Sequence, residues 1–256
     1  MALNVLDDGR MYTLALDTTN PVGGLALLRG RAVAARLDGD PGRTHGERLP
    51  GDILRVLETT AVRLRDIDLY AVARGPGGFT GLRVGMATIQ GLALVHARPV
   101  VAVSALEAAA RGALVAGADL GPDDLVGVWL DAHRGEVFSA LYGQRPSGVT
   151  TTQIEAIDGP GVDVPAPILA RWRSAAGARR VWLAGGGARR YRTEARRAGF
   201  VDEIAVDQNL AAVVGIMAVE SARRGATQSP HELAPLYIRR PDAELARQRR
   251  AVRSQP

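Results

Sequence analysis

The sequence contains no cysteine and no lysine, and it has few aromatic residues. The absence of cysteine excludes disulfide bonds and thiolate metal sites, which fits a reducing compartment. All 32 basic residues are arginine, and 27 acidic residues leave a net charge of only +5. Aromatic residues make up 4% of the chain, too few for the base-stacking surfaces of many RNA-binding domains.

Long apolar runs are also missing. No stretch approaches the ~18–20 apolar residues that a membrane-spanning helix requires. The first ten residues carry Asp7 and Asp8 and lack the apolar segment of a signal peptide. We therefore expect a cytoplasmic protein that does not enter the membrane. With 256 residues, 46% of them hydrophobic, the chain is long enough for one large domain or two smaller ones.

The most distinctive stretch is residues 74–85, Arg-Gly-Pro-Gly-Gly-Phe-Thr-Gly-Leu-Arg-Val-Gly. A strand-like run precedes it and a helix-like run, residues 82–97, follows it. Its glycines let the backbone approach other groups closely, and the N-terminus of a helix suits an anion such as phosphate. Neither the Walker A loop nor the dinucleotide-binding pattern matches the spacing. A phosphate-binding loop and a tight strand-to-helix turn therefore both remain open.

Hydrophobic periodicity predicts two successive α/β units. In the first unit we expect strands at 11–19, 22–28, 31–37, 69–73 and 100–103, with helices at 45–60 and 82–97. In the second we expect helices from 104 to 116 and at 210–223, with strands at 125–131, 137–142, 150–154 and 181–184. Both units contain a strand that ends in an aspartate and continues into a hairpin, so the layout repeats.

The predicted domains follow from these units. Residues 11–107 form an N-terminal domain, and residues 108–240 form a smaller C-terminal domain. A helix around 208–224 is expected to pack back on the first domain. Residues 241–256 form an arginine-rich tail that we expect to be disordered.

The helix after the glycine-rich stretch carries small residues at Gly81, Gly85, Thr88, Gly91 and Ala93. Each glycine inside a helix costs about 1 kcal/mol relative to alanine. Such a cost suggests that another element packs closely against this face. That element is either the sheet of this chain or a helix of a partner.

Several motifs together resemble one known family. They are Leu14–Thr18, His45-x-x-x-Leu49-Pro50, residues 74–85, residues 131–138 (Asp-Ala-His-Arg-Gly-Glu-Val-Phe) and the late Pro235–Arg239. This combination resembles TsaB (YeaZ), the bacterial accessory subunit of tRNA threonylcarbamoyladenosine synthesis. The resemblance extends from about Met11 to Arg239, and the glycine-rich stretch is its most specific part.

The resemblance implies an actin-like, sugar-kinase-like (ASKHA) α/β fold, with two α/β domains and mixed sheets. It also implies a non-catalytic subunit of the bacterial tRNA N6-threonylcarbamoyladenosine modification complex. In that complex TsaB scaffolds and activates its paralogue, the TsaD transferase, together with the TsaE ATPase, and TsaC makes the threonylcarbamoyl-adenylate. The chain would then meet tRNA only indirectly, through the complex. Whether it forms a homodimer when alone stays open.

The resemblance further assigns roles to two groups of residues. Helices of the N-terminal domain form the bundle between the paralogues. The expected interface residues are His45, Leu49, Ile53, Leu82, Gly85, Met86, Ile89 and Leu92. The family-motif loop comprises Gly75, Pro76, Gly77, Phe79, Thr80, Gly81 and Arg83.

A metal site is not expected. TsaD-like proteins carry His-Met-Glu-Gly-His after the strand that follows the glycine-loop helix, and both histidines bind the metal. The equivalent stretch here is residues 105–109, with Ala105 and Ala109 at the two ligand positions. An alkyl side chain cannot coordinate a metal ion. The four histidines of the chain (His45, His96, His133 and His231) show no ligand spacing.

A degenerate nucleotide cleft is the remaining candidate site, at Asp17, Thr18, Asp131, Gly185 and Gly186. The turn after Asp17 lacks the glycine that lets backbone wrap a phosphate. Two acids facing one cleft could hold Mg²⁺ through water, but we favour turn-forming, N–H-capping roles for both. We expect no cofactor of its own, and ATP or ADP with Mg²⁺ only at the complex interface.

Three other functions compete with an accessory subunit. A small-molecule kinase or ATPase of the same fold would need intact phosphate loops. A metalloprotease would need the absent histidine pair. A direct RNA-binding module is least favoured, since the charge is spread along the sequence and aromatics are few.

Overall fold

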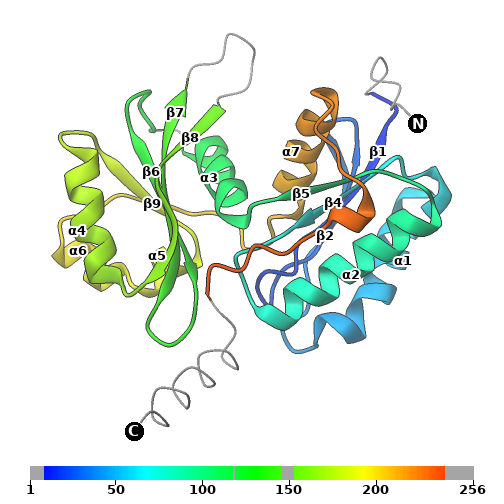
Figure 1. Cartoon of the computed structure of the whole chain (residues 1–256), viewed down its shortest axis with the longest axis horizontal. Helices are drawn as coiled ribbons and strands as arrows, with labels where there is room; N and C mark the ends of the chain where they lie inside the picture. The colour runs from blue at the N-terminus through cyan, green and yellow to red at the C-terminus, as the bar shows by residue number, and fades with distance from the viewer. Residues whose placement is uncertain (1–8, 118, 146–152, 240–256) are drawn as a thin grey trace, which may run out of the picture.

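The computed structural model describes residues 9–117, 119–145 and 153–239, so the predicted disorder of residues 241–256 falls outside the described residues. The chain forms two five-stranded sheets side by side (Figure 1), with strand orders β3-β2-β1-β4-β5 and β10-β9-β6-β7-β8. Each sheet mixes antiparallel and parallel pairs. The predicted α/β class with two mixed sheets is confirmed.

The first sheet is built from residues before position 104. β1, β2 and β3 form an antiparallel meander, and β4 and β5 continue the sheet in parallel from β1. The bounds are β1 Tyr12–Leu16, β2 Leu25–Arg29, β3 Ala32–Leu37, α1 His45–Thr60, the 3₁₀ turn η1 Leu64–Asp66, β4 Leu69–Ala73, α2 Phe79–Val95 and β5 Val100–Val103. Helices α1 and α2 are the crossovers that precede the two parallel strands, as parallel pairing requires.

The second sheet repeats this plan. Counted outward from its central strand β6, two antiparallel strands lie on one side and two parallel strands on the other. The bounds are α3 Ala105–Ala116, β6 Leu125–Asp131, β7 Val137–Arg145, β8 Gln153–Asp163, α4 Pro165–Ala176, β9 Val181–Ala184, α5 Gly186–Arg190, α6 Arg192–Arg197, β10 Glu203–Ile204, α7 Ala211–Arg223 and the 3₁₀ turn η2 Pro230–Glu232.

Most predicted elements form at or near their predicted bounds, but the region after β7 differs. Residues 150–152 of the strand predicted at 150–154 lie outside the described residues, and the described part belongs to β8, Gln153–Asp163. Helix α4 was not predicted. Most side chains of β8 are exposed or half-buried, so no alternating apolar pattern marks it. Helix α4 begins with proline at its first position, which helices tolerate because that N–H would be unpaired anyway.

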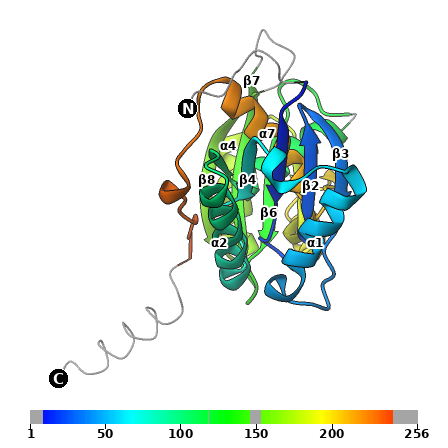
Figure 2. The same ribbon diagram turned by 90° about the vertical axis from the view of Figure 1, so that its right-hand side faces the viewer.

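Five layers result from the packing of helices on the sheets (Figure 1), and Figure 2 views the molecule from the side of α1 and α2. Helices α1 and α2 cover the outer face of the first sheet, and α7 covers its inner face. Successive side chains along β1 point to opposite faces of the sheet. Leu14 and Leu16 therefore pack toward α1 and α2, and Ala15 packs toward α7. Helix α3 lies between the sheets, and α4 to α6 cover the outer face of the second sheet around Trp129 and Trp172.

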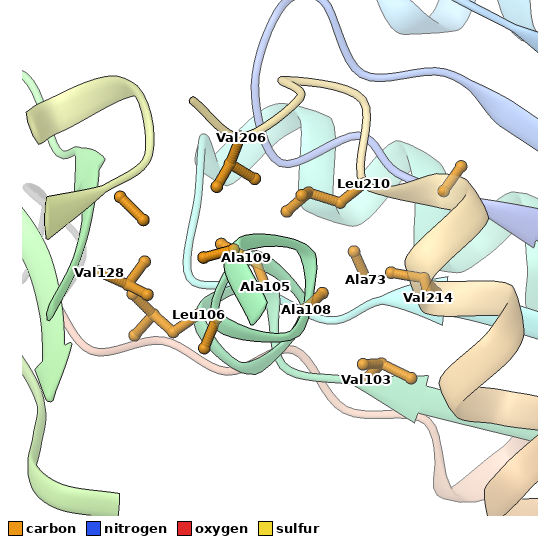
Figure 3. Close-up of a cluster of buried hydrophobic side chains, with 14 of the residues drawn as sticks. Ala73, Val103, Ala105, Leu106, Ala108, Ala109, Val128, Val206, Leu210 and Val214 are labelled. Atoms are coloured by element: carbon orange, nitrogen blue, oxygen red, sulfur yellow. The ribbon is translucent and has the colours of Figure 1, made fainter. Parts of the chain in front are cut away.

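The central layer is rich in alanine. Figure 3 shows Ala105, Ala108 and Ala109 of α3 among larger side chains such as Leu210 and Val214. Small side chains let α3 and α7 approach the sheets closely while the interior stays densely packed. The inner helices therefore join the two domains through a continuous apolar core.

The segment after α7 crosses both domains. Gln228 pairs with Val100 at the free edge of β5, with backbone hydrogen bonds of 2.9 and 3.1 Å. Leu236 N then donates to Arg74 O at 2.7 Å, directly before the glycine-rich stretch. Finally Arg239 donates to Ala132 O at 2.7 Å in the second domain. The late Pro-Leu-Tyr-Ile-Arg motif thus lies beside the glycine-rich loop.

Candidate functional site

A cavity of about 900 Å³ lies between the two domains. Its wall combines the turn after β1, the glycine-rich loop, the hairpin after β6 and the start of α5. The predicted residues on this wall are Thr18, His45, Pro76, Gly77, Phe79, Thr80, Gly81, Asp131, Gly185 and Gly186. The structure therefore brings together most of the predicted loop and cleft residues from segments far apart in the sequence.

Asp17 is completely buried beneath this wall. Its Oδ1 accepts hydrogen bonds from Thr19 N at 2.9 Å and Thr19 Oγ1 at 2.7 Å, and its Oδ2 accepts one from Leu210 N at 3.0 Å. Burial raises the pKa of the Asp17 carboxyl, although the hydrogen bonds from Thr19 and Leu210 and the charge of Arg48 oppose this shift. The carboxylate thus caps its own turn and the start of α7.

Asp131 is likewise occupied by groups of the chain. Its Oδ1 accepts a hydrogen bond from His133 N at 2.9 Å, and its Oδ2 pairs with Arg190 Nη1 at 2.7 Å. An arginine therefore lies where a cation bound to this carboxylate would lie. Among residues 9–117, 119–145 and 153–239, no cluster of three or more His, Cys, Asp or Glu residues could hold a metal ion.

The two alanines that align with the TsaD metal ligands lie on α3. Ala105 is 0% exposed and Ala109 is 1% exposed, and both pack in the apolar layer between the sheets (Figure 3). At both positions the side chain is a methyl group, which offers no nitrogen or oxygen ligand. The residues present do not fit the metal of the catalytic paralogue.

The glycine-rich loop packs against the turn after β1. Gly78 N donates to Thr19 O at 2.8 Å. A Cβ atom at Gly77 would overlap the backbone of Thr19, and one at Gly81 would overlap Thr18 O. These glycines are needed because two backbone segments touch. The contact is one between parts of this chain, as a tight strand-to-helix turn requires.

An aromatic and arginine cluster lies at the rim of the loop. The rings of Phe79 and Tyr237 have centroids 5.2 Å apart, and the Arg83 guanidinium lies 3.9 Å above the Phe79 ring. Arg83 Nε also donates to the Tyr237 hydroxyl at 3.0 Å. The sequence motifs include both the glycine-rich stretch and the late Pro235–Arg239 segment. No spacing rule predicts that Arg83 and Tyr237, which are 154 positions apart, come into contact.

A buried ion pair in α1 was missed by sequence reasoning. Arg48 and Asp52 are each 2% exposed, and Arg48 Nη1 donates to Asp52 Oδ2 at 2.8 Å. Arg48 also donates to Gly23 O, which fixes α1 to the loop before β2. Burial, and next the nearby Arg48 charge, lower the pKa of His45 at the start of the helix. The i,i+4 spacing of Arg48 and Asp52 was the available signal.

Most residues of the predicted partner interface lie inside the first domain. Six of its eight residues (Leu49, Ile53, Leu82, Gly85, Met86 and Ile89) are buried inside this chain, and His45 and Leu92 are half-buried. A Cβ atom at Gly85 would overlap Thr18 Oγ1. The inner faces of α1 and α2 therefore form the core of the first domain. A partner that docks on these helices meets their outer faces.

Comparisons with known proteins agree with this geometry. The family model described as TsaD, tRNA N6-adenosine threonylcarbamoyltransferase, matches residues 40–177, more than half of the chain. The tRNA threonylcarbamoyladenosine biosynthesis protein TsaB of Escherichia coli is 35% identical over 54% of this chain and 58% of its own length. The chain belongs to the family that this model describes, and within it the chain is similar to proteins named TsaB.

Two further relatives extend the match along the chain. An uncharacterised protein of Mycobacterium tuberculosis is 30% identical over 90% of this chain and 93% of its own length. YeaZ from Pseudomonas aeruginosa is 25% identical, with a TM-score of 0.69 over 89% of this chain and 99% of that chain. The matched part spans little more than half the length of the Escherichia coli and Bacillus subtilis TsaB proteins.

The described residues contain no helix with the length and apolar character that crossing a bilayer demands.

Proposed function

We propose that the chain is a non-catalytic subunit in the synthesis of tRNA N6-threonylcarbamoyladenosine, paired with a TsaD-type transferase and assisted by a TsaE-type ATPase. The observation that carries this proposal is that the acidic groups at the cleft are already engaged by other groups of the chain. Asp17 is used by the backbone of the chain, Asp131 is paired with Arg190, and alanines stand at the two metal-ligand positions. A catalytic partner would have to supply the metal and the phosphate-binding groups.

The outer faces of α1 and α2 support the pairing. Gly46 and Gly51 on α1 and Gly91 on α2 are exposed, and a Cβ atom at each would meet open space. Leu54 is 54% exposed and Leu94 is 43% exposed on the same outer faces. Small residues beside exposed leucines allow the close approach of helices from a second protein.

The test is reconstitution with the paralogue. We expect the purified chain to hydrolyse no ATP alone, to co-elute with the TsaD-type paralogue, and to be required for threonylcarbamoyladenosine formation on tRNA. Modified nucleoside is measured by mass spectrometry after tRNA digestion. Full modification by the other components without this chain would contradict the proposal.

A surface variant locates the interface. We expect Gly91→Leu to abolish co-elution with the paralogue, because the new side chain separates the two helix surfaces. The fold should persist, because the exposed site has room and leucine favours a helix by up to about 1 kcal/mol over glycine. Two control variants, Gly225→Leu and Gly225→Asn, change an exposed turn with a positive φ that lies outside α1 and α2. Both control proteins should still co-elute with the paralogue. Normal pairing by a folded Gly91→Leu protein would exclude this face.

A small-molecule kinase or ATPase is the second candidate. The size of the cavity and the arginines on its wall, Arg43, Arg189 and Arg190, favour it, since such groups suit a phosphate ligand. ATP turnover by the isolated chain that is lost in Asp131→Asn would favour this candidate over the accessory subunit. Asp131 is the better probe than Asp17, because Asp17 is needed to cap α7.

A further inference from the structure

One layer of the described chain carries an excess of positive charge. Residues 165–206, which include α4, α5 and α6, contain nine arginines and three acidic residues. The other 214 residues contain 23 arginines and 24 acidic residues. This short region therefore has a formal net charge of +6, residues 240–256 add +3, and the remaining residues carry −4. A count over the whole sequence hides this asymmetry.

The fold presents these arginines on the side away from the first domain. Helices α4 and α6 contact each other on the outer face of the second sheet (Figure 1). The apolar side chains of α4, Ile168, Leu169 and Trp172, point into the sheet and are buried. The outward surface of the layer is therefore polar and cationic.

Several of these charges have no acidic partner. The side chains of Arg196 and Arg197 on α6 are exposed and make no hydrogen bond or ion pair within the part of the chain that the structure describes. Arg179 donates only to the carbonyl groups of Ala175 and Ala176, and Arg173 donates to the carbonyl of Ala198. A carbonyl acceptor leaves the charge of the guanidinium uncompensated. We call Arg173, Arg179, Arg196 and Arg197 the arginine face.

A hollow of about 310 Å³ lies within this face. Arg173, Arg179 and Arg180 line it, together with Ala198 and Gly199, which directly follow Arg196 and Arg197 in the chain. Its single acidic residue, Asp202, is already paired with Arg180, at 2.5 and 2.7 Å. The hollow therefore offers guanidinium groups with capacity for an additional anion.

We propose that the arginine face binds the phosphate backbone of folded RNA. Guanidinium groups match phosphate oxygens in a forked geometry, and several spaced cations fit a repeating polyanion. A lipid surface fits less well, because a membrane-binding helix exposes an apolar face and α4 buries its own. The choice of tRNA as this RNA rests on the proposed function.

The chemistry of the face defines the expected mode of binding. Arginines without neighbouring exposed aromatic rings contact phosphates and do not stack on bases, so binding should tolerate changes of RNA sequence. The affinity should fall with salt, because each phosphate contact releases counterions, with a slope of about 0.7–0.9 per contact. The contacts would position tRNA for the transferase and carry no sequence recognition.

The test compares two pairs of arginines by fluorescence anisotropy with labelled, unmodified tRNA. The variant of the arginine face, called the patch variant, combines Arg196→Gln with Arg197→Gln. The matched control is Arg29→Gln with Arg65→Gln, two exposed arginines of the first domain whose side chains make no hydrogen bond or ion pair among the described residues. Both variants lower the net charge by the same amount and leave the buried core unchanged.

We expect the patch variant to bind tRNA about tenfold more weakly near 100 mM salt and to lower the salt slope by about 1–2. The control should change affinity less than about twofold. Equal weakening in both variants, no tRNA binding by the full chain or its complex with the paralogue, or preferential binding to phosphatidylserine vesicles would overturn the inference.

Co-elution with the paralogue separates this inference from the proposed function. The patch variant should still co-elute, because α4 and α6 lie on the opposite side of the molecule from α1 and α2 (Figure 1). A chain that binds tRNA through the arginine face but pairs with no transferase would refute the proposed function alone. A chain that pairs and supports modification equally well in the patch variant, with unchanged tRNA affinity, would refute the inference alone.

Discussion

The two outer helix layers of the molecule cover sheets of the same strand order, yet they use charge in opposite ways. In the first domain, α1 buries the pair Arg48–Asp52, and its outward face mixes Gly46, Gly51 and Leu54 with charges of both signs, Glu47, Arg55 and Glu58. In the second domain, α4 to α6 bury only apolar and aromatic side chains and present arginines outward. The first layer suits a protein partner, and the second suits a polyanion.

This difference teaches that topology alone does not decide what a domain binds. Both layers solve the same packing problem, since each must cover one apolar face of a twisted sheet. The residues that point away from the sheet are free of that constraint. The two domains therefore keep one architecture while their surfaces serve different purposes.

The largest effect should come from breaking the buried pair. We expect Asp52→Ala to lower the free energy of unfolding by about 3–5 kcal/mol, because it leaves the Arg48 guanidinium buried without its carboxylate. Urea denaturation followed by circular dichroism measures this change. The matched change in the second domain, Glu203→Ala, removes the half-buried carboxylate on β10 that pairs with the exposed Arg192, and it should cost much less because water screens an exposed pair. Equal losses would remove the distinction between the layers.

A smaller effect should separate the two faces of α2. We expect Gly85→Leu to lower the free energy of unfolding by about 1–3 kcal/mol, because the side chain must displace Thr18 in a filled core. Gly91→Leu should leave it equal or slightly higher, since nothing lies within 4 Å of its Cβ position. Thermal unfolding of the two variants gives the comparison. A destabilised Gly91→Leu protein would mean that the outer face is already packed within this chain.

The smallest effect concerns how the contributions of two aspartates to stability depend on pH. The pKa of each carboxyl group is measured from its ¹³C chemical shift during a pH titration. Burial raises the pKa of Asp17 above 3.8, so its contribution to stability is present at low pH and falls as pH rises through the folded value. The Arg180 pairing lowers the pKa of Asp202, so its contribution is present above pH 3.8 and is lost as pH falls through the folded value. If the pKa values of Asp17 and Asp202 both lay above 3.8, or both below it, this contrast would be contradicted.

Local sequence features predict much of the fold. Helix α1 and strands β4, β5, β6 and β9 begin and end at the predicted residues. These elements combine clear apolar periodicity with recognisable ends, such as the capping box that Thr44 forms with Glu47. Strand β8 was misjudged because no alternating apolar pattern marks it. Helix α4 was missed although Ile168, Leu169 and Trp172 follow helical spacing, so the signal was available.

The sequence predicted which residues belong to the candidate site, but it did not predict their contacts or their burial. Thr18, Asp131 and the glycines near position 185 do meet in one cavity, as expected when strand ends of two repeated units face each other. Sequence patterns could not show that Asp131 is paired with Arg190, 59 positions away. They also could not show which face of α2 is buried, because glycines occur on both faces.

The amino-acid sequence by itself determined the elements, the repeated strand plan and the family, because these depend on periodicity and on motifs of neighbouring residues. Only the tertiary structure decided which of these residues remain available. It buried Gly85 and Asp17 within the chain, left Gly91 in open space, and gathered the excess arginines on one outer layer. The physical reason is that burial and charge compensation depend on contacts between distant segments, and such contacts exist only in the folded chain.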